Sequence, residues 1–442
     1  MKKAILITSV HSNAGKTFIA TGFCKCFNEL QLKVAPFKCG PDYIDSAILS
    51  KAANSPAYNL DSVFMNKRVL KTLFFNQLHN SDIAVVEGVM GFLDGINSNF
   101  KASTFEIAKL LDLSTIFIIN PLFSSQSVLL TIKGIETFLK NVNVIGVILN
   151  NVSSDKQRLL IMDAIRKYTK IKVFGVIPRL NKSPFSSRHL GLKTALEIDD
   201  NLLGEASDII NTYIKIDEIL ACANIKITNV TKKAYVKKVK TKGLAYVAYD
   251  EAFNFYYTSN IKYLEGLGYI IHFFSPLKNE GFKDADLLYI GGGYPELFAD
   301  VLEKNEKTLE SIVVHHDKKK SIIAECGGFM YLSKAIKTET GIYGMCNIFD
   351  ITFEMNSKRQ ALGYVDVEFM VDLKGLKKGT KAKGHIYHYS TINYCKEPFI
   401  LKLSTLSTKE VLYDGVFKNN AFASYTHFHF LSSNNIFKEL IK

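Results

Sequence analysis

The chain has 442 residues, of which 47% are hydrophobic and 12% aromatic, so it can form large cores without disulfide bonds or metal ions. No apolar run approaches the roughly 18 residues that a membrane-spanning helix needs, and the one near the N-terminus leads into Gly15-Lys16-Thr17 instead of a signal-peptide cleavage site. We therefore expect a cytoplasmic protein without a membrane partner. The net charge of +13 suits a polyanionic partner, unless the lysines are simply spread over solvated faces.

Strand and helix signals alternate through the first part of the chain. The strand-like runs are nearly unbroken and rich in β-branched residues, which is typical of parallel strands buried on both faces. They lie at 4–10, 33–38, 82–89, 115–120, 144–150 and 172–178. The pattern predicts an α/β domain with a parallel sheet over residues 1–195.

A helical and polar segment follows, and residues 231–243 contain six lysines and no acidic residue. We expect 196–242 to form a helical, basic connector. Strand signals resume at 244–250, 269–276, 286–293 and 321–328, and the chain beyond Met345 is richer in strands. These signals predict a second α/β domain over residues 243–442.

The segment after the first strand has the features of a phosphate-binding loop. Residues 11–17 read HSNAGKT and open a helix, whose free N–H groups can cradle phosphates. In this loop, which includes Ser12 and Gly15, Lys16 would neutralise β and γ oxygens and Thr17 would bind Mg²⁺. Val10 stands where the usual motif has its first glycine, a variant that resembles the dethiobiotin-synthetase type. The loop predicts nucleotide binding.

Charged residues also follow the second and third strands. Glu87 ends the third strand, where a Mg²⁺ ligand beside a P-loop is expected. Asp94 lies farther along the same loop as a second ligand, a substrate contact or a simple turn residue. Lys38 leads into a Gly-Pro loop with two carboxylates, and it could stabilise a transferring phosphoryl group. The alternative for that loop is an ordinary turn.

Cys326 lies in the segment SIIAECGGFMYL, residues 321–332. The pattern predicts a buried strand that breaks sharply into a helix, with the cysteine at the turn. The helix N-terminus would lower the pKa of the thiol and make it a better nucleophile. The alternative is a core cysteine before a Gly-rich turn. The other six cysteines fit no zinc pattern, and we take them as structural.

An ordered set of motifs gives the chain a resemblance to a known family. Together they resemble the cobyrinic acid a,c-diamide synthase family, between about Ile5 and Phe430. The motifs are KCGPDYID, VVEGVMGFLDG, GVILNNV, SRHLGL, YDEAFNFYY, FFSPL, GGGYPELF, AECGGFMYL and GHIYHYS.

The resemblance implies an amidation that depends on ATP and L-glutamine. A dethiobiotin-synthetase-like domain would phosphorylate a substrate carboxylate, and a class I glutaminase-like domain would release ammonia that displaces the phosphate. The a and c carboxylates of a corrin-type tetrapyrrole polycarboxylate, cobyrinic acid, would become amides through acyl phosphates, in cobalamin biosynthesis.

The resemblance also assigns the glutaminase residues. In the motif SYTHFHF, His427 would be the general base for Cys326. His429 stands where many class I glutaminases carry a glutamate, so a Cys–His dyad is expected instead of a triad. Backbone N–H groups of Gly292 and Gly293 in the GGGYPE loop are the candidates for oxyanion stabilisation.

For the synthetase domain the same resemblance supplies three groups of residues. The nucleotide would be bound by Ser12, Gly15, Lys16, Thr17, Lys38 and Asn150. The substrate would be contacted by Tyr43, Asp45, Asp94 and Arg188. Mg²⁺ would be held by Thr17, Asp45 and Glu87.

The chain departs from the family pattern at three places. Ser46 replaces a proline after GPDYID, Asn120-Pro121 replaces an acidic residue, and Ile386 replaces a glutamate in GHIYHYS. The last change puts in doubt any role carried over for that side chain.

Other functions remain open from the sequence. Within the family, the substrate could instead be hydrogenobyrinic acid or Ni-sirohydrochlorin, whereas the GPDYID loop argues against a cobyric acid synthase. A switch-type P-loop ATPase would explain Lys16 and leave Cys326 and His427 without a role. A nucleic-acid partner is not expected, because the sequence has no recognition helix or stacking-aromatic module. The sequence leaves open whether the protein forms a homodimer.

Overall fold

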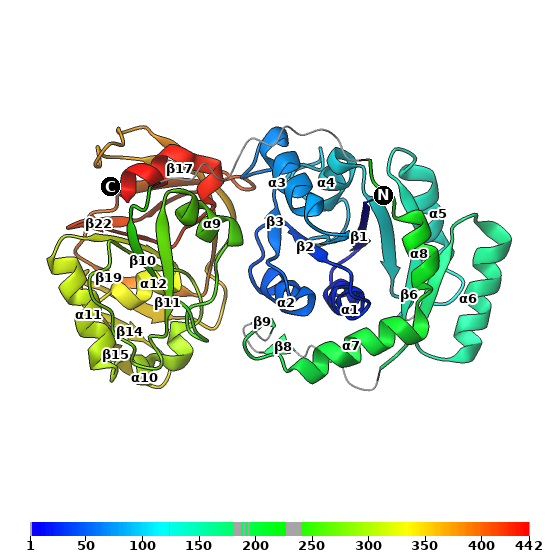
Figure 1. Ribbon diagram of the computed structural model, residues 1–442, viewed down its shortest axis with the longest axis horizontal. Coiled ribbons are helices and arrows are strands. Elements are labelled where there is room, and N and C mark those ends of the chain that lie inside the picture. Colours follow the sequence, from blue (N-terminus) through cyan, green and yellow to red (C-terminus); the bar gives the residue numbers. More distant parts are fainter. Residues whose placement is uncertain are drawn as a thin grey trace. The chain divides into compact units, whose positions relative to one another are not determined.

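The computed structural model describes residues 2–122, 124–180, 187–188, 191–192, 195–226 and 240–441. The chain divides into two compact units, unit 1 (Met1–Lys232) and unit 2 (Lys233–Lys442). Both are of the α/β class that the sequence predicted (Figure 1). In the described part of the chain, no helix has the length and apolar character needed to cross a membrane.

Unit 1 is built on one sheet of seven parallel strands in the order β3-β2-β4-β1-β5-β6-β7. All six predicted strands of this region are present. The sequence did not predict β3, because three residues give too short a signal. The strands are β1 (Lys3–Ser9), β2 (Val34–Cys39), β3 (Tyr58–Leu60), β4 (Ile83–Glu87), β5 (Ser114–Ile119), β6 (Val144–Val152) and β7 (Val173–Pro178).

Helices connect these strands and bury their apolar sides in the sheet's core. The central β1, β2 and β4 are almost completely buried, as expected for strands covered on both faces. The helices are α1 (Lys16–Glu29), α2 (Ile44–Ala53), α3 (Lys67–His79), α4 (Thr104–Leu111), α5 (Val128–Phe138), α6 (Asp155–Tyr168), α7 (Asp200–Tyr213) and α8 (Ile216–Cys222). Two short strands, β8 (Ser187–Arg188) and β9 (Gly191–Leu192), form a separate pair.

The helical part of the expected connector is an integral part of unit 1. Leu203 and Ile210 of α7 are buried in its core, and α1 and α7 pack so closely that a Cβ on Gly22 would lie 2.7 Å from the carbonyl oxygen of Ala206. After α8, the carbonyl of Ala223 accepts the N–H of Ala4. These residues read as polar in the sequence because only one face of α7 is apolar. Residues 227–239, which include most of the lysine run, lie outside the described part.

Unit 2 contains a six-stranded sheet in the order β11-β10-β12-β13-β23-β22, parallel except for the last pair. All four strands predicted for this sheet are present. The strands are β10 (Gly243–Ala248), β11 (Tyr269–Phe274), β12 (Leu287–Ile290), β13 (Ser321–Glu325), β22 (Val416–Lys418) and β23 (Ala421–Ser424). The helices of the unit are α9 (Thr258–Gly266), α10 (Ala299–Leu302), α11 (Glu306–Asp317), α12 (Gly327–Leu332) and α13 (Asn434–Leu440), with short 3₁₀ turns η1 (Pro295–Phe298) and η2 (Phe430–Ser433).

The strand-rich end of the chain forms two further sheets. One has the order β15-β14-β16-β19, and the other, fully antiparallel, has the order β21-β20-β17-β18-β24. Their strands are β14 (Ala335–Lys337), β15 (Ile342–Gly344), β16 (Ile351–Met355), β17 (Ala361–Phe369), β18 (Lys381–His388), β19 (Ser390–Cys395), β20 (Leu401–Thr405), β21 (Val411–Asp414) and β24 (His427–Phe428).

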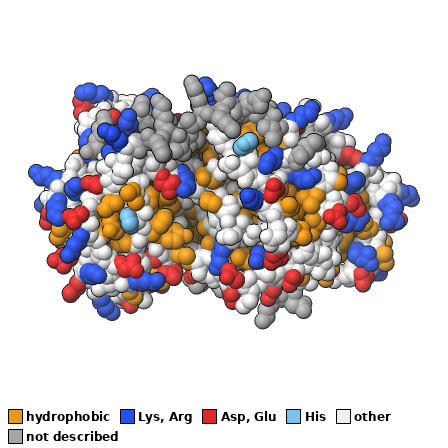
Figure 2. Space-filling view, in the orientation of Figure 1, with side chains coloured by type: hydrophobic (Ala, Val, Ile, Leu, Met, Phe, Trp, Pro, Cys, Tyr) orange, Lys and Arg blue, Asp and Glu red, His pale blue; other side chains and the backbone are white. Residues whose placement is uncertain are grey.

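The charged side chains are mixed on the surface that Figure 2 shows. Lysine and arginine side chains alternate with acidic ones over that face. This distribution agrees with the interpretation that many of the 55 basic residues are spread over solvated surface.

Candidate active sites

In unit 1, the turn between β1 and α1 brings a lysine back onto its own loop. Gly15, with φ of +95°, precedes the helix, and the Nζ of Lys16 lies 3.0 Å from the Oγ of Ser9 and 3.3 Å from the carbonyl oxygen of His11. Lys16 is only 7% exposed. Burial, assisted by the nearby Lys38, lowers the pKa of Lys16 to about 8. The ammonium is therefore still mostly charged at neutral pH, and it is weakly solvated.

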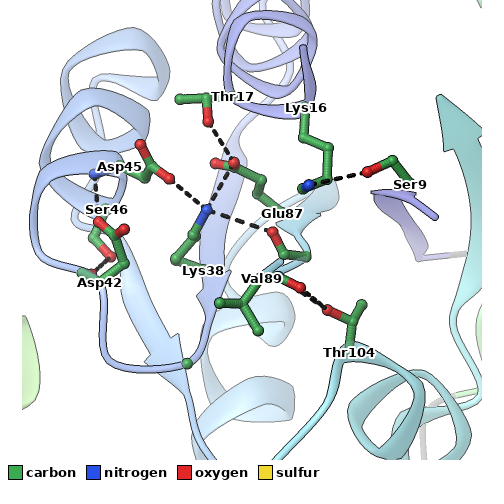
Figure 3. Close-up of polar contacts among 12 residues, drawn as sticks. Ser9, Lys16, Thr17, Lys38, Asp42, Asp45, Ser46, Glu87, Val89 and Thr104 are labelled. Atoms are coloured by element: carbon green, nitrogen blue, oxygen red, sulfur yellow. Dashed lines mark hydrogen bonds and ion pairs between the residues drawn. The ribbon is translucent and has the colours of Figure 1, made fainter. Parts of the chain in front are cut away.

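A second lysine lies at the centre of a carboxylate cluster beside this loop (Figure 3). The Nζ of Lys38 donates to the Oδ2 of Asp45 and, at 2.7 Å, to the Oε1 of Glu87. The hydroxyl of Thr17 donates to the same Oε1 at 2.7 Å. Sheet order explains the cluster, because β4 lies between β1 and β2, and Glu87 pairs with Ile7 on one side and Lys38 on the other.

The cluster is buried and its charges are strongly coupled. Burial alone would lower the pKa of Lys38, but the carboxylates of Asp45 and Glu87 raise it well above its ordinary value. Burial and the neighbouring Asp45 raise the pKa of Glu87. Two carboxylate oxygens, Oδ1 of Asp45 and Oε2 of Glu87, are buried without a hydrogen-bond partner in the described part of the structure.

The other residues assigned to this site have more varied positions. The Nδ2 of Asn150 donates to the carbonyl of Ala14 at 2.9 Å and so contacts the phosphate loop. Asp94 is exposed, and its Oδ2 accepts the N–H of Gly91 at 2.9 Å, which is the contact of a turn residue. Tyr43 is half-buried directly before α2. The backbone of Arg188 lies in β8, but its side chain is outside the described residues.

Two serines matter more here than the sequence suggested. The hydroxyl of Ser9 contacts Lys16, and its position at the end of β1 was the available signal. Ser46, which replaces a family proline, is accommodated because its hydroxyl donates to the carbonyl of Asp42 at 2.7 Å. The third departure, Ile386 of β18, is buried in the apolar core of unit 2, so this position offers no polar side chain to a substrate.

In unit 2, Cys326 occupies the sharp turn between β13 and α12. Its φ of +50° and ψ of −104° are unusual for a residue with a side chain, and a strained backbone of this kind is typical of functional turns. The turn is held by two backbone hydrogen bonds, from Cys326 to the carbonyl of Ser424 at 2.8 Å and from Gly328 to that of Gly291 at 3.0 Å. The predicted strand–turn–helix around Cys326 is confirmed.

The glycine loop and His427 meet beside this turn. A Cβ on Gly292 would lie 2.5 Å from the Cε1 of His427, and a Cβ on Gly327 would lie 3.0 Å from the backbone N of Gly293. The backbone N–H of Gly327 also acts on the Cys326 thiol, whose pKa it lowers. Gly327, directly after the cysteine, is therefore a further oxyanion candidate that the sequence interpretation omitted.

The expected lowering of the thiol pKa is wrong for the protein without substrate. Burial is the largest effect and raises the pKa of Cys326, and the carboxylate of Glu296 raises it further. The backbone N–H of Gly327, at the start of the helix, lowers it but does not outweigh burial. Burial also lowers the pKa of His427 to about 3, and that of His429 to about 3. At neutral pH the site therefore contains a thiol and a neutral imidazole.

Alkylation should reveal this protonation state. Because only the thiolate reacts, and its fraction rises tenfold per pH unit below the pKa, we expect the iodoacetamide rate at Cys326 to rise about tenfold per unit from pH 7 to 9. Peptide mass spectrometry would measure the rate, with the half-exposed Cys395 as an internal reference. A rate that is already independent of pH above 7 would contradict the raised pKa.

Comparisons with known proteins find two separate domain matches in the chain. Residues 5–190 match the CobQ/CobB/MinD/ParA nucleotide binding domain, and residues 245–435 match the CobB/CobQ-like glutamine amidotransferase domain.

Three curated relatives are each named cobyrinate a,c-diamide synthase. The protein of Listeria monocytogenes serotype 4b is 36% identical over 96% of this chain and 96% of its own length. That of Caldanaerobacter subterraneus is 35% identical over 97% and 95%, and that of Fusobacterium nucleatum is 34% identical over 99% and 100%. The chain therefore belongs to the cobyrinate a,c-diamide synthase family and is a glutamine-hydrolysing ligase.

Proposed function

We propose that this enzyme amidates the a and c carboxylates of cobyrinic acid, with ATP and glutamine as co-substrates and acyl phosphates as intermediates. The observation that carries the proposal is that one chain combines the buried Lys38 cluster beside Lys16 with the strained Cys326 turn. The first suits phosphoryl transfer, and the second suits the release of ammonia from glutamine. The names of the relatives support the choice of substrate.

In unit 1, the proposed chemistry is activation of a carboxylate. A carboxylate is a poor electrophile, and transfer of a phosphoryl group gives it a leaving group. Lys16 would leave Ser9 and His11 to contact the β and γ phosphates, with Ser12, Gly15 and Asn150 shaping the loop. Lys38 would neutralise charge on the transferring group, because phosphoryl transfer depends mainly on positioning and charge. Tyr43, Asp45, Asp94 and Arg188 are the proposed substrate contacts.

The residues present fit Mg²⁺, which the family implies. Thr17, Asp45 and Glu87 offer hard oxygen ligands, and Asp45 and Glu87 each have a buried oxygen without a partner. Within the described residues, no group of three or more His, Cys, Asp or Glu side chains is placed to hold a metal. A site of two carboxylates and a hydroxyl is nevertheless usual for Mg²⁺, which takes phosphate oxygens and water as its other ligands. When bound, the ion would neutralise phosphate charge.

In unit 2, Cys326 would attack the side-chain amide of glutamine. His427 would take the proton of the thiol and then give it to the leaving ammonia. The N–H groups of Gly293 and Gly327 would stabilise the oxyanion, with Gly292 leaving room for the imidazole. Water would then hydrolyse the thioester to glutamate. The ammonia released would displace phosphate from the acyl phosphate.

The substrate can be tested directly. Purified enzyme with Mg-ATP and glutamine is expected to convert cobyrinic acid to a product that has two amides in place of two acids, as read by mass. Ni-sirohydrochlorin and hydrogenobyrinic acid are the alternative substrates to test in parallel. Amidation of one of these alone would move the proposal to that macrocycle, and no amidation of any tetrapyrrole would reject it.

Gly15 offers a selective test of the nucleotide site. Gly15→Ala places a Cβ 2.3 Å from the Nδ2 of Asn150 in a backbone conformation that costs L-residues about 1–2 kcal/mol. We expect ATP affinity, measured by calorimetry, to fall at least about tenfold. Gly134→Ala is the control, because a Cβ there meets nothing within 4 Å. Equal ATP affinity in both variants would contradict the assignment of this loop.

A further inference from the structure

The short strand that holds His427 has little support from a sheet. Within the described residues, β24 pairs with β18 alone, through Gly384–Phe428 and His385–His427. Buried side chains nevertheless fix the backbone on both sides of His427. The geometry of the candidate base therefore depends on side-chain hydrogen bonds more than on a strand ladder.

Before His427, the carboxylate of Asp414 holds the chain. It accepts the N–H groups of Tyr425 and Thr426, each at 2.9 Å, and the hydroxyl of Thr426 at 2.7 Å. Asp414 is 2% exposed. Asp414, the last residue of β21, therefore holds the backbone of the two residues that precede His427.

After His427, a three-residue network holds the chain. The Oε1 of Glu325 accepts the N–H of Phe428 at 2.9 Å, and its Oε2 accepts the hydroxyl of Tyr289 at 2.8 Å. The Nδ2 of Asn260 donates to the carbonyl of Phe428 at 2.8 Å and to the hydroxyl of Tyr289 at 3.3 Å, and its Oδ1 accepts the N–H of Phe430 at 2.8 Å. Glu325 thus binds the N–H of Phe428 and Asn260 binds its carbonyl, while the hydroxyl of Tyr289 joins Glu325 to Asn260.

The network connects the two halves of the candidate dyad. Glu325 is the last residue of β13 and directly precedes Cys326 in the chain. Its carboxylate accepts the N–H of Phe428, the residue directly after His427. Asn260 and Tyr289 are fully buried, and Glu325 is 2% exposed. Every side-chain oxygen and nitrogen of the three residues has a partner, so the arrangement is rigid and specific.

We propose that Glu325 is a positioning residue for His427, and that it acts with Tyr289 and Asn260 by fixing Phe428 against the turn of Cys326. The inference rests on the proposed Cys326–His427 dyad. Its chemistry differs from that of a triad acid, because the carboxylate binds the backbone after the histidine and the Tyr289 hydroxyl. A role in stability alone is the competing explanation.

Glutamine hydrolysis by the full chain separates the two explanations. For Glu325→Ala we expect kcat to fall about 100-fold, as for a displacement of about 1 Å in an active site, with KM for glutamine nearly unchanged. Glu325→Gln should recover most of kcat, because its amide oxygen can still accept the N–H of Phe428. A fall confined to KM, or a kcat equal to that of the parent enzyme, would overturn the inference.

A matched tyrosine pair decides the question if Glu325→Ala does not fold. Tyr289→Phe removes the hydroxyl that binds Glu325, whereas Tyr269→Phe removes a buried hydroxyl of the same sheet that donates to the carbonyl of Ile441 at 3.2 Å. We expect kcat to fall only in Tyr289→Phe, while thermal unfolding shifts by similar amounts in both. Equal kcat values in the two variants would overturn the inference.

Cys326→Ala in the same assay distinguishes failure of the proposed Cys326–His427 dyad from failure of the positioning role of Glu325. If glutamine hydrolysis survives in that variant, the proposed dyad fails. If hydrolysis is lost there while the Glu325 and Tyr289 variants keep the kcat of the parent enzyme, the dyad stands and only the positioning role is rejected.

Discussion

Cys326→Ala is expected to abolish glutamine-dependent amidation and to leave ammonium-driven amidation intact. Loss of the nucleophile from a catalytic triad removes nearly all catalysis, so without Cys326 glutamine hydrolysis should fall by at least about 10³-fold. The proposed synthetase residues Lys16, Lys38 and Glu87 belong to unit 1, which has its own core. With ammonium chloride in place of glutamine, the amide product should therefore form at close to the parent rate.

Cys346→Ala is the control for this change. Cys346 is buried in the same apolar core as Cys326 and is 5% exposed, so its truncation removes a similar volume without touching the turn. It should keep both activities. If Cys326→Ala also stops ammonium-driven synthesis, the proposed division of labour between the units is wrong.

The sequence predicted those parts of the protein in which the signal is continuous along the chain. Buried parallel strands are runs of β-branched residues, and the phosphate loop is a single segment between β1 and α1, so both could be found from sequence alone. The turn at Cys326 is likewise contained in a single continuous segment, so it could also be found from sequence alone. Fold class and the positions of most strands followed from these local patterns.

Contacts that depend on strand order could not be predicted in the same way. Lys38 and Glu87 are 49 positions apart, and their 2.7 Å contact exists because β2 and β4 are neighbours in the sheet. The contacts of Glu325 could not be predicted either, because its partners Tyr289 and Phe428 come from β12 and β24. The raised pKa of Cys326 could not be predicted either, since burial depends on the whole fold.

Lys16→Ala is expected to have the opposite effect to Cys326→Ala. Without the ammonium, the phosphate charge is not neutralised, and we expect amidation to fall by about 10³-fold with either glutamine or ammonium as the nitrogen source. Basal glutamine hydrolysis should remain, because Cys326 and His427 belong to unit 2. Product mass and glutamate release would measure the two activities.

Lys25→Ala tests whether the effect of Lys16→Ala is specific. Lys25 lies on the same helix α1, where its ammonium is 3.2 Å from the carboxylate of Glu29, and both side chains are partly exposed. Exposed pairs of this kind contribute at most about 1 kcal/mol, so this variant should keep both activities. Amidation that survives in Lys16→Ala would mean that Lys38, the more deeply buried lysine of the cluster, neutralises the phosphates without its neighbour. Loss of hydrolysis together with amidation would instead mean that unit 2 needs an intact nucleotide site in order to cleave glutamine.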